Sequence, residues 1–118
     1  MHEFSIITEL FKIMEETAHA HNLVKVESVI IHAGALRQIH KAALLAAWQE
    51  ITQSTIAENS TLELTVLPAR IRCLNCRKES GVEDICFVCG FCSSGEVEVI
   101  QGNELILHTI RGENSHGD

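Results

Sequence analysis

All five cysteines of the chain lie in one short segment, between Cys73 and Cys92, and their spacing is typical of metal ligands. Cys73 and Cys76 form one CxxC pair, and two further pairs overlap, Cys86 with Cys89 and Cys89 with Cys92. A CxxC turn brings two thiolates onto one ion, and two such turns complete the tetrahedral all-sulfur shell that zinc prefers. An odd number of cysteines cannot pair fully into disulfides, so the clustered thiols indicate a metal site.

The second pair can be formed in two ways. Twelve residues separate Cys76 from Cys89 and nine separate Cys76 from Cys86, and either loop can close. A shell of four thiolates leaves no coordination position open, so we expect the bound Zn(II) to be structural and to hold together a segment with almost no core. A redox sensor built on the thiols is an alternative interpretation.

A second possible metal site lies at the start of the chain, Met1-His2-Glu3. The Met1 amine, the His2 amide nitrogen and the His2 imidazole can form fused chelate rings on one ion, and the Glu3 amide nitrogen can complete a square. Such a planar nitrogen set suits Ni(II) or Cu(II) better than zinc. A frayed, solvated terminus is the alternative, but an amphipathic pattern begins at Phe4 and indicates that the terminus is tied to the folded domain.

Composition excludes several other functions. The net charge is −7, and aromatic residues make up only 4% of the 118 residues, so a nucleic-acid-binding surface is not expected. No apolar run is long enough to span a membrane and no signal peptide opens the chain, so we expect a cytoplasmic protein with no membrane partner. No nucleophile with a base and no phosphate loop is present, so we expect no enzyme.

The first half of the chain predicts a helix, a strand and a second helix. Residues 4–18 carry an apolar stripe at spacings of three and four, and Asn22 is the expected stop. Residues 25–32 are rich in β-branched side chains and indicate a strand, which Gly34 ends in a turn. Residues 38–52 predict the second helix. Its expected buried face consists of Ala43, Leu44, Ala47, Trp48 and Ile51.

The second half predicts strands on both sides of the cysteines. Residues 61–67 alternate, with Leu62, Leu64 and Val66 on one face. Residues 96–100 and 104–110 are also strand-like, and the residues between them could form a hairpin turn or a bulge in one bent strand.

These elements predict an α+β fold, with a small sheet of about three strands and two helices, and an inserted four-cysteine, zinc-ribbon-like lobe. We place the first domain at residues 1–70 together with 96–113 and the zinc-binding domain at residues 71–95. Residues 114–118 are expected to form a disordered tail.

The motifs together resemble the HypA/HybF family of nickel-incorporation accessory proteins for [NiFe]-hydrogenase maturation, over essentially the whole chain. The matching stretches are Met1-His2-Glu3, Gly34-Ala35-Leu36, residues 54–58, Cys73-Leu74-Asn75-Cys76, the second cysteine pair and Gln101-Gly102-Asn103-Glu104. Two departures stand out. The second cysteine pair lacks the family's usual proline. Arg37 replaces a serine in a loop where His40 could supply an extra nickel ligand.

The resemblance implies a nickel metallochaperone that carries Ni(II) as transient cargo at Met1, His2 and Glu3. It implies zinc ligands at Cys73, Cys76, Cys89 and Cys92, with Cys86 spare. The implied partners are the maturation GTPase HypB and the hydrogenase large-subunit precursor, with urease maturation proteins in some organisms. A zinc-ribbon adaptor that binds proteins or nucleic acid, without delivering nickel, is the alternative.

Overall fold

The computed structural model describes residues 2–82 and 87–114, with side chains from Phe4 onward. The chain divides into two compact units. The helical unit consists of residues 1–31, 39–65 and 106–118, and the cysteine unit consists of residues 32–38 and 66–105. The sequence analysis divides the chain into a nickel-binding and a zinc-binding domain. Those functional boundaries stay predictions. Of the expected tail, Asn114 is the last residue of a strand, and residues 115–118 lie outside the described part.

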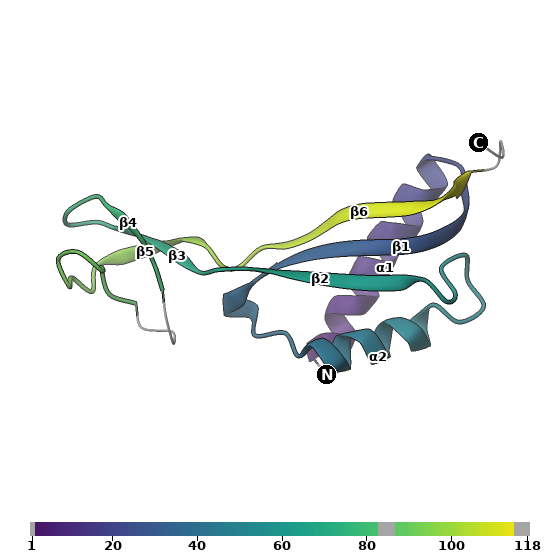
Figure 1. Cartoon of the computed structure of the whole chain (residues 1–118), viewed down its shortest axis with the longest axis horizontal. Helices are drawn as coiled ribbons and strands as arrows, with labels where there is room; N and C mark the ends of the chain where they lie inside the picture. Colours follow the sequence, from purple (N-terminus) through teal and green to yellow (C-terminus); the bar gives the residue numbers. More distant parts are fainter. Residues whose placement is uncertain (1, 83–86, 115–118) are drawn as a thin grey trace. The chain divides into compact units, whose positions relative to one another are not determined.

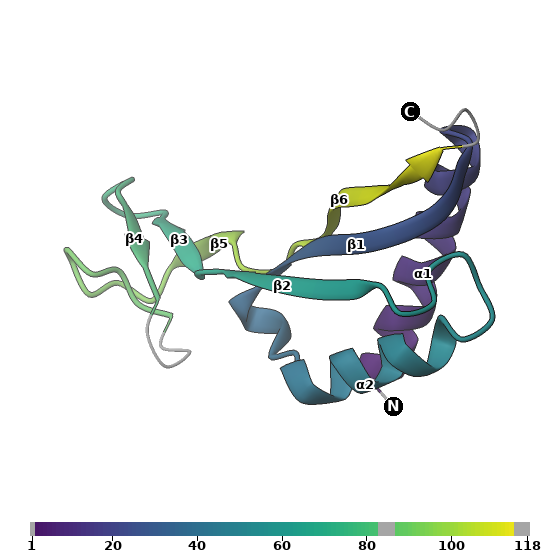
Figure 2. The same ribbon diagram turned by 45° about the vertical axis from the view of Figure 1, so that its right-hand side comes forward.

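The helical unit combines two helices with a three-stranded sheet, which confirms the predicted α+β class. Helices α1 (His2–Ala20) and α2 (Lys41–Ile51) lie on the same side of the sheet (Figures 1 and 2). The sheet has the order β2-β1-β6. Its strands are β1 (Leu23–Gly34), β2 (Thr61–Leu67) and β6 (Leu105–Asn114).

Helix α1 forms where the sequence predicts it because its apolar stripe meets the core. Ile7, Leu10, Met14 and Ala18 recur at helical spacing, and each is at most 1% exposed. The helix gives way to a turn in which Asn22 adopts a left-handed conformation with φ 58°, which confirms the predicted stop. Within the described part of the chain, no helix is both long and apolar enough to cross a membrane.

Helix α2 begins three residues later than the sequence predicts. Residues Ala35–Arg37 form a 3₁₀ turn that ends at Gln38, which is in the left-handed region with φ 50°. Helix α2 therefore begins only after this turn. His40 then caps α2, because its Nδ1 accepts a hydrogen bond from the Ala43 amide at 3.3 Å. Ala43 itself is exposed, so its predicted place on the buried face is wrong.

Trp48 anchors α2 in the core of the helical unit. It is 1% exposed, and the Phe11 ring of α1 meets it edge-on with 6.1 Å between the ring centroids. Its indole Nε1 donates to Ser60 Oγ at 2.8 Å, so the one polar atom of this ring is satisfied. The Thr52 hydroxyl donates to the Trp48 carbonyl at 2.7 Å where the helix ends.

The cysteine unit contains a second sheet of three short strands in the order β4-β3-β5. These strands are β3 (Arg70–Cys73), β4 (Glu79–Gly81) and β5 (Val97–Gln101), and β3 pairs antiparallel with both neighbours. The Arg72 guanidinium reaches Glu98 at 3.1 Å and Glu79 at 3.3 Å across the sheet. These bonds, first to Glu98 and then to Glu79, raise the pKa of Arg72.

The two strand-like runs after the cysteines enter different sheets, β5 in the second and β6 in the first, so the residues between them form neither a hairpin nor a bulge. Gly102 has φ 137°, which few other residues tolerate. Its carbonyl accepts from the Leu36 amide at 3.0 Å. The backbones cross so closely that a Cβ on Gly34 would lie 1.9 Å from this carbonyl oxygen. Two glycines thus permit the crossing.

Candidate metal centre

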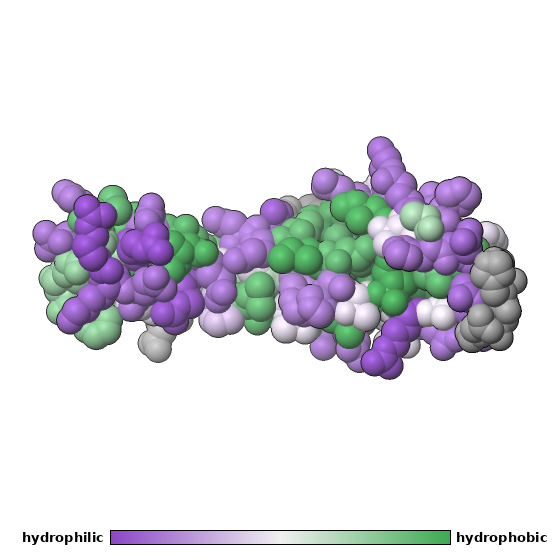
Figure 3. Space-filling view, turned by 90° about the horizontal axis from the view of Figure 1, so that it is seen from above, coloured by the Kyte–Doolittle hydropathy of each residue, from purple (hydrophilic) through white to green (hydrophobic). Residues whose placement is uncertain are grey.

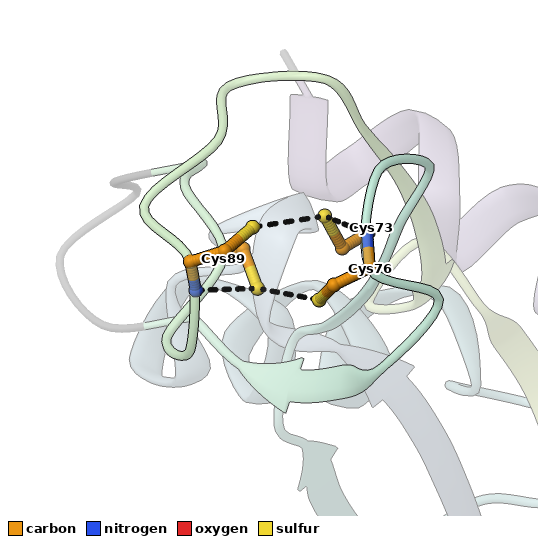
Figure 4. A group of neighbouring side chains, drawn as sticks. Cys73, Cys76 and Cys89 are labelled. Carbon is orange, nitrogen blue, oxygen red and sulfur yellow. Dashed lines mark hydrogen bonds between the residues drawn. The ribbon is translucent and has the colours of Figure 1, made fainter.

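Four cysteines of the cysteine unit converge on one point. Cys73 Sγ lies 3.6 Å from Cys92 Sγ, and Cys76 Sγ lies 3.6 Å from Cys89 Sγ. All four sulfur atoms lie within 4.8 Å of one another. Figure 4 shows the two turns that carry them, which face each other with the sulfur atoms between them. The structure therefore brings together the set that the sequence analysis favours.

The first pair is positioned by a tight turn at the end of β3. The amides of Asn75 and Cys76 both donate to Cys73 Sγ at 3.3 Å. The Arg77 amide donates to the Cys73 carbonyl at 3.0 Å, and the Cys73 amide donates to the Lys78 carbonyl at 2.9 Å. Arg77 closes the turn in the left-handed region, φ 68°.

The second pair repeats this turn with different side chains. The amides of Phe91 and Cys92 donate to Cys89 Sγ at 3.3 and 3.4 Å. Ser93, at φ 62°, donates to the Cys89 carbonyl at 3.0 Å, and the Cys89 amide donates to the Ser94 carbonyl at 2.9 Å. We call the two turns, residues 73–78 and residues 87–95, the first and the second knuckle. The sequence analysis predicts two CxxC turns, and the structure adds the backbone hydrogen bonds and left-handed residues that close each of them.

The sulfur cluster fits a tetrahedral zinc ion. Zn–S bonds of about 2.3 Å place tetrahedral sulfurs about 3.8 Å apart. The Cys73–Cys92 and Cys76–Cys89 sulfur pairs are each 3.6 Å apart. Amide hydrogen bonds to sulfur orient the ligands and stabilise thiolate charge. Cys73 and Cys89 are buried, Cys76 is half-buried and Cys92 is exposed. A bound ion would therefore be partly shielded from water on the Cys73 and Cys89 side.

The surroundings favour ionisation of the first cysteine of each knuckle. The backbone amide of Cys92, followed by that of Phe91, lowers the pKa of Cys89 to about 6. The Cys76 amide lowers the pKa of Cys73 in the same way. For Cys76, the backbone of Lys78 lowers the pKa, but burial and the adjacent thiols outweigh it and raise the pKa to about 11. Several thiolates close together repel one another. A divalent cation would offset this repulsion and favour the ionised form of all four cysteines.

Other residues from the sequence analysis lie partly or wholly outside the described structure. Cys86 and Met1 are not among the described residues, so the rivalry between Cys86 and Cys92 is untested. The backbone of His2 and Glu3 begins α1, but their side chains are not described. His40 caps α2, a role that the sequence analysis did not foresee. The signal was present, because His40 lies just before the apolar repeat of α2.

Comparison with known proteins agrees with the resemblance. The family model described as hydrogenase/urease nickel incorporation, metallochaperone, HypA, matches residues 1–112. The hydrogenase maturation factor HypA of Acidithiobacillus ferrooxidans is 33% identical, over 96% of this chain and 100% of its own. That of Aquifex aeolicus is 30% identical, over 96% of this chain and 98% of its own.

A solved structure shows the same fold. The solution structure of the nickel metallochaperone HypA from Helicobacter pylori covers 98% of this chain and 100% of its own, with a TM-score of 0.72 and 23% identity. The matched region spans both units of this chain. The family match over residues 1–112 and the relatives aligned along their whole length lead to one conclusion: this chain belongs to the HypA family of hydrogenase and urease nickel-incorporation metallochaperones.

Proposed function

We propose that the chain binds Ni(II) at Met1, His2 and Glu3 and delivers it to the large subunit of a [NiFe]-hydrogenase, while Zn(II) at Cys73, Cys76, Cys89 and Cys92 holds the cysteine unit together. Membership of the nickel-incorporation family carries the first part. The cluster of four sulfur atoms carries the second part. Zinc there supplies cross-linking of the two knuckles and no chemistry on a substrate.

The chemistry of the cysteine cluster supports a separate nickel site. Four thiolates close a tetrahedral shell, and a closed shell holds its ion tightly and leaves no position for an incoming ligand. A metallochaperone must release its cargo to an acceptor. The exchangeable ion therefore needs ligands elsewhere, and the nitrogen donors at the chain terminus suit Ni(II).

The start of α1 at His2 also supports this site. The first four amides of an α-helix have no carbonyl partner within the helix. Nickel can therefore bind the amide nitrogens of His2 and Glu3 without breaking helical hydrogen bonds. Deprotonated amides are also negatively charged, and negative charge is favoured at a helix N-terminus.

The proposed partners follow from the family. We expect the maturation GTPase HypB to hand nickel to this chain and the hydrogenase large-subunit precursor to receive it, with urease maturation proteins as further clients. We expect this exchange to occur in the cytoplasm, without catalysis by this chain and without nucleic acid or a membrane as partner.

Nickel titration of variants tests the proposed site. His2→Ala is expected to abolish stoichiometric nickel binding and leave the zinc content unchanged. His19→Ala is the matched control, because His19 is an exposed histidine at the other end of α1. Full nickel binding by His2→Ala would show that the cargo site lies elsewhere.

His40 is tested by a substitution that separates its two possible roles. His40→Asn keeps a capping side chain on α2 but removes the imidazole. If His40 supplies a nickel ligand, nickel affinity falls in this variant while the stability of the helical unit is retained. Unchanged nickel affinity would leave His40 as a helix cap alone.

A further inference from the structure

Large apolar side chains are exposed around the knuckles. Leu74, Phe87, Val88 and Phe91 are all exposed, and Phe91 most of all, at 63%. In the space-filling view, green hydrophobic side chains lie beside purple hydrophilic ones in the cysteine unit, at the left-hand end (Figure 3). We call these four residues together with Lys78 the knuckle surface. Apolar groups gathered on a small folded unit are typical of a protein-binding site.

Lys78 joins the two knuckles on this surface. It belongs to the first knuckle, and its Nζ lies 4.9 Å from the centroid of the Phe91 ring of the second. This cation–π contact orients the ring without burying it, since the ring remains 63% exposed. An aromatic side chain held in place but left open to solvent can bind a partner at little entropic cost.

The charge of the knuckles differs in sign from that of the whole chain. Residues 73–78 and 87–95 contain two charged side chains, Arg77 and Lys78, and both are basic and exposed. The chain as a whole has a net charge of −7. The two turns thus carry two exposed basic side chains, and acidic residues flank them in the sequence at Glu79, Glu83, Asp84 and Glu96.

Two of the acidic residues nearest in the sheet share one arginine. Glu79 and Glu98 both bind Arg72, at 3.3 and 3.1 Å. Glu96 borders the surface, because its carbonyl accepts from the Leu74 amide at 2.8 Å. Arg77 and Lys78 are both exposed, so their side chains can pair with carboxylates of a partner.

We propose that the knuckle surface is a docking site for an acidic, apolar polypeptide segment of the protein that accepts nickel. This inference rests on the proposed function, which supplies an acceptor. Apolar side chains of that segment would cover Phe91 and its neighbours, and its carboxylates would pair with Arg77 and Lys78. The amide hydrogen bonds of the knuckles would hold the surface in its binding conformation.

Binding of the zinc-loaded full chain to the purified hydrogenase large-subunit precursor, measured by calorimetry at low and high salt, tests the proposal. Phe91→Ala is expected to weaken binding about tenfold or more, as for a central aromatic contact. Lys78→Glu is expected to weaken binding most at low salt, where electrostatic attraction is least screened.

Two variants control for loss of apolar surface and for change of charge. Val99→Ala removes an exposed apolar side chain from β5 of the same unit, and Lys12→Glu makes the same charge change on α1. Both are expected to bind like the wild type. Lys78→Glu also serves as the second test if Phe91→Ala loses its zinc.

Wild-type affinity in both Phe91→Ala and Lys78→Glu would overturn the proposal. Equal weakening in the two controls would overturn it too, as would absence of binding by the wild type. Nickel titration of the same samples separates these outcomes from failure of the proposed function. A wild type that binds both nickel and the precursor, together with unchanged precursor affinity in Phe91→Ala and Lys78→Glu, contradicts the docking site alone.

Discussion

The two units of the chain are stabilised in different ways. The helical unit has a hydrophobic core in which Ile7, Leu10, Met14, Ile31 and Trp48 are all at most 1% exposed. The cysteine unit buries few side chains besides two of its cysteines, and Ile71 is the large apolar one among those described. A unit with so little buried apolar surface needs a cross-link, and a structural metal provides one.

The difference has a consequence for function. Helices and a sheet that fold around their own core can carry a metal site at a chain end, where release of the ion leaves the core intact. Under the proposed function the metal of the knuckles holds their structure together, so that metal would not serve as cargo. The comparison therefore predicts that each unit responds to a different perturbation.

Removal of zinc is expected to have the largest effect, and only in the cysteine unit. Structural zinc contributes about 10–16 kcal/mol of binding free energy in small zinc-folded domains. Strong chelation, or Cys76→Ser, should therefore unfold the knuckles. The single tryptophan, Trp48, lies in the helical unit and reports on that unit alone. Its fluorescence should stay unchanged while amide NMR signals of the cysteine unit collapse, and a red shift on zinc loss would refute the independence of the two units.

Truncation of a core residue is expected to have the reverse effect. Leu10 is 1% exposed, so Leu10→Ala should lower the free energy of unfolding of the helical unit by about 2–5 kcal/mol. Urea unfolding followed by Trp48 fluorescence measures this change. Ile13→Ala is the matched control on the same helix, because Ile13 is 42% exposed. The zinc content should be normal in both variants, and zinc loss in Leu10→Ala would argue against separate stabilisation.

A smaller effect is expected where two backbone segments of the cysteine unit cross. Gly34→Ala places a methyl group against the Gly102 carbonyl and should destabilise the protein by about 1–3 kcal/mol. Gly95→Ala is the control, because a Cβ at Gly95 meets nothing within 4 Å. A clear drop in melting temperature is expected for the first variant only. Equal melting temperatures would mean that the crossing relaxes without cost.

The sequence predicted the elements whose pattern is local. The apolar stripe of α1 leads directly to the observed helix, because burial of one face determines it. The alternation of residues 61–67 also leads to the observed strand β2, although only Leu62 of its apolar face is buried and Val66 is 56% exposed. The CxxC spacing likewise leads to the four-cysteine cluster, since the motif itself forms the turn.

Features that depend on distant segments could not be predicted. The late start of α2 depends on the 3₁₀ turn at Ala35–Arg37, where the Arg37 Nε donates to the Asn103 carbonyl at 2.8 Å. The separation of β5 from β6 depends on the same crossing at Gly102. Both involve partners far apart in the sequence, so residue patterns alone do not reveal them.

The central claim is that one chain holds two metals at separate sites with separate roles. Zinc and nickel content, measured together on the wild type, His2→Ala and Cys76→Ser after nickel loading, tests it most directly. We expect one zinc in the wild type and in His2→Ala, and nickel in the wild type and in Cys76→Ser. We expect no nickel in His2→Ala and no zinc in Cys76→Ser. Loss of both metals from either variant, or nickel retained by His2→Ala, would contradict it.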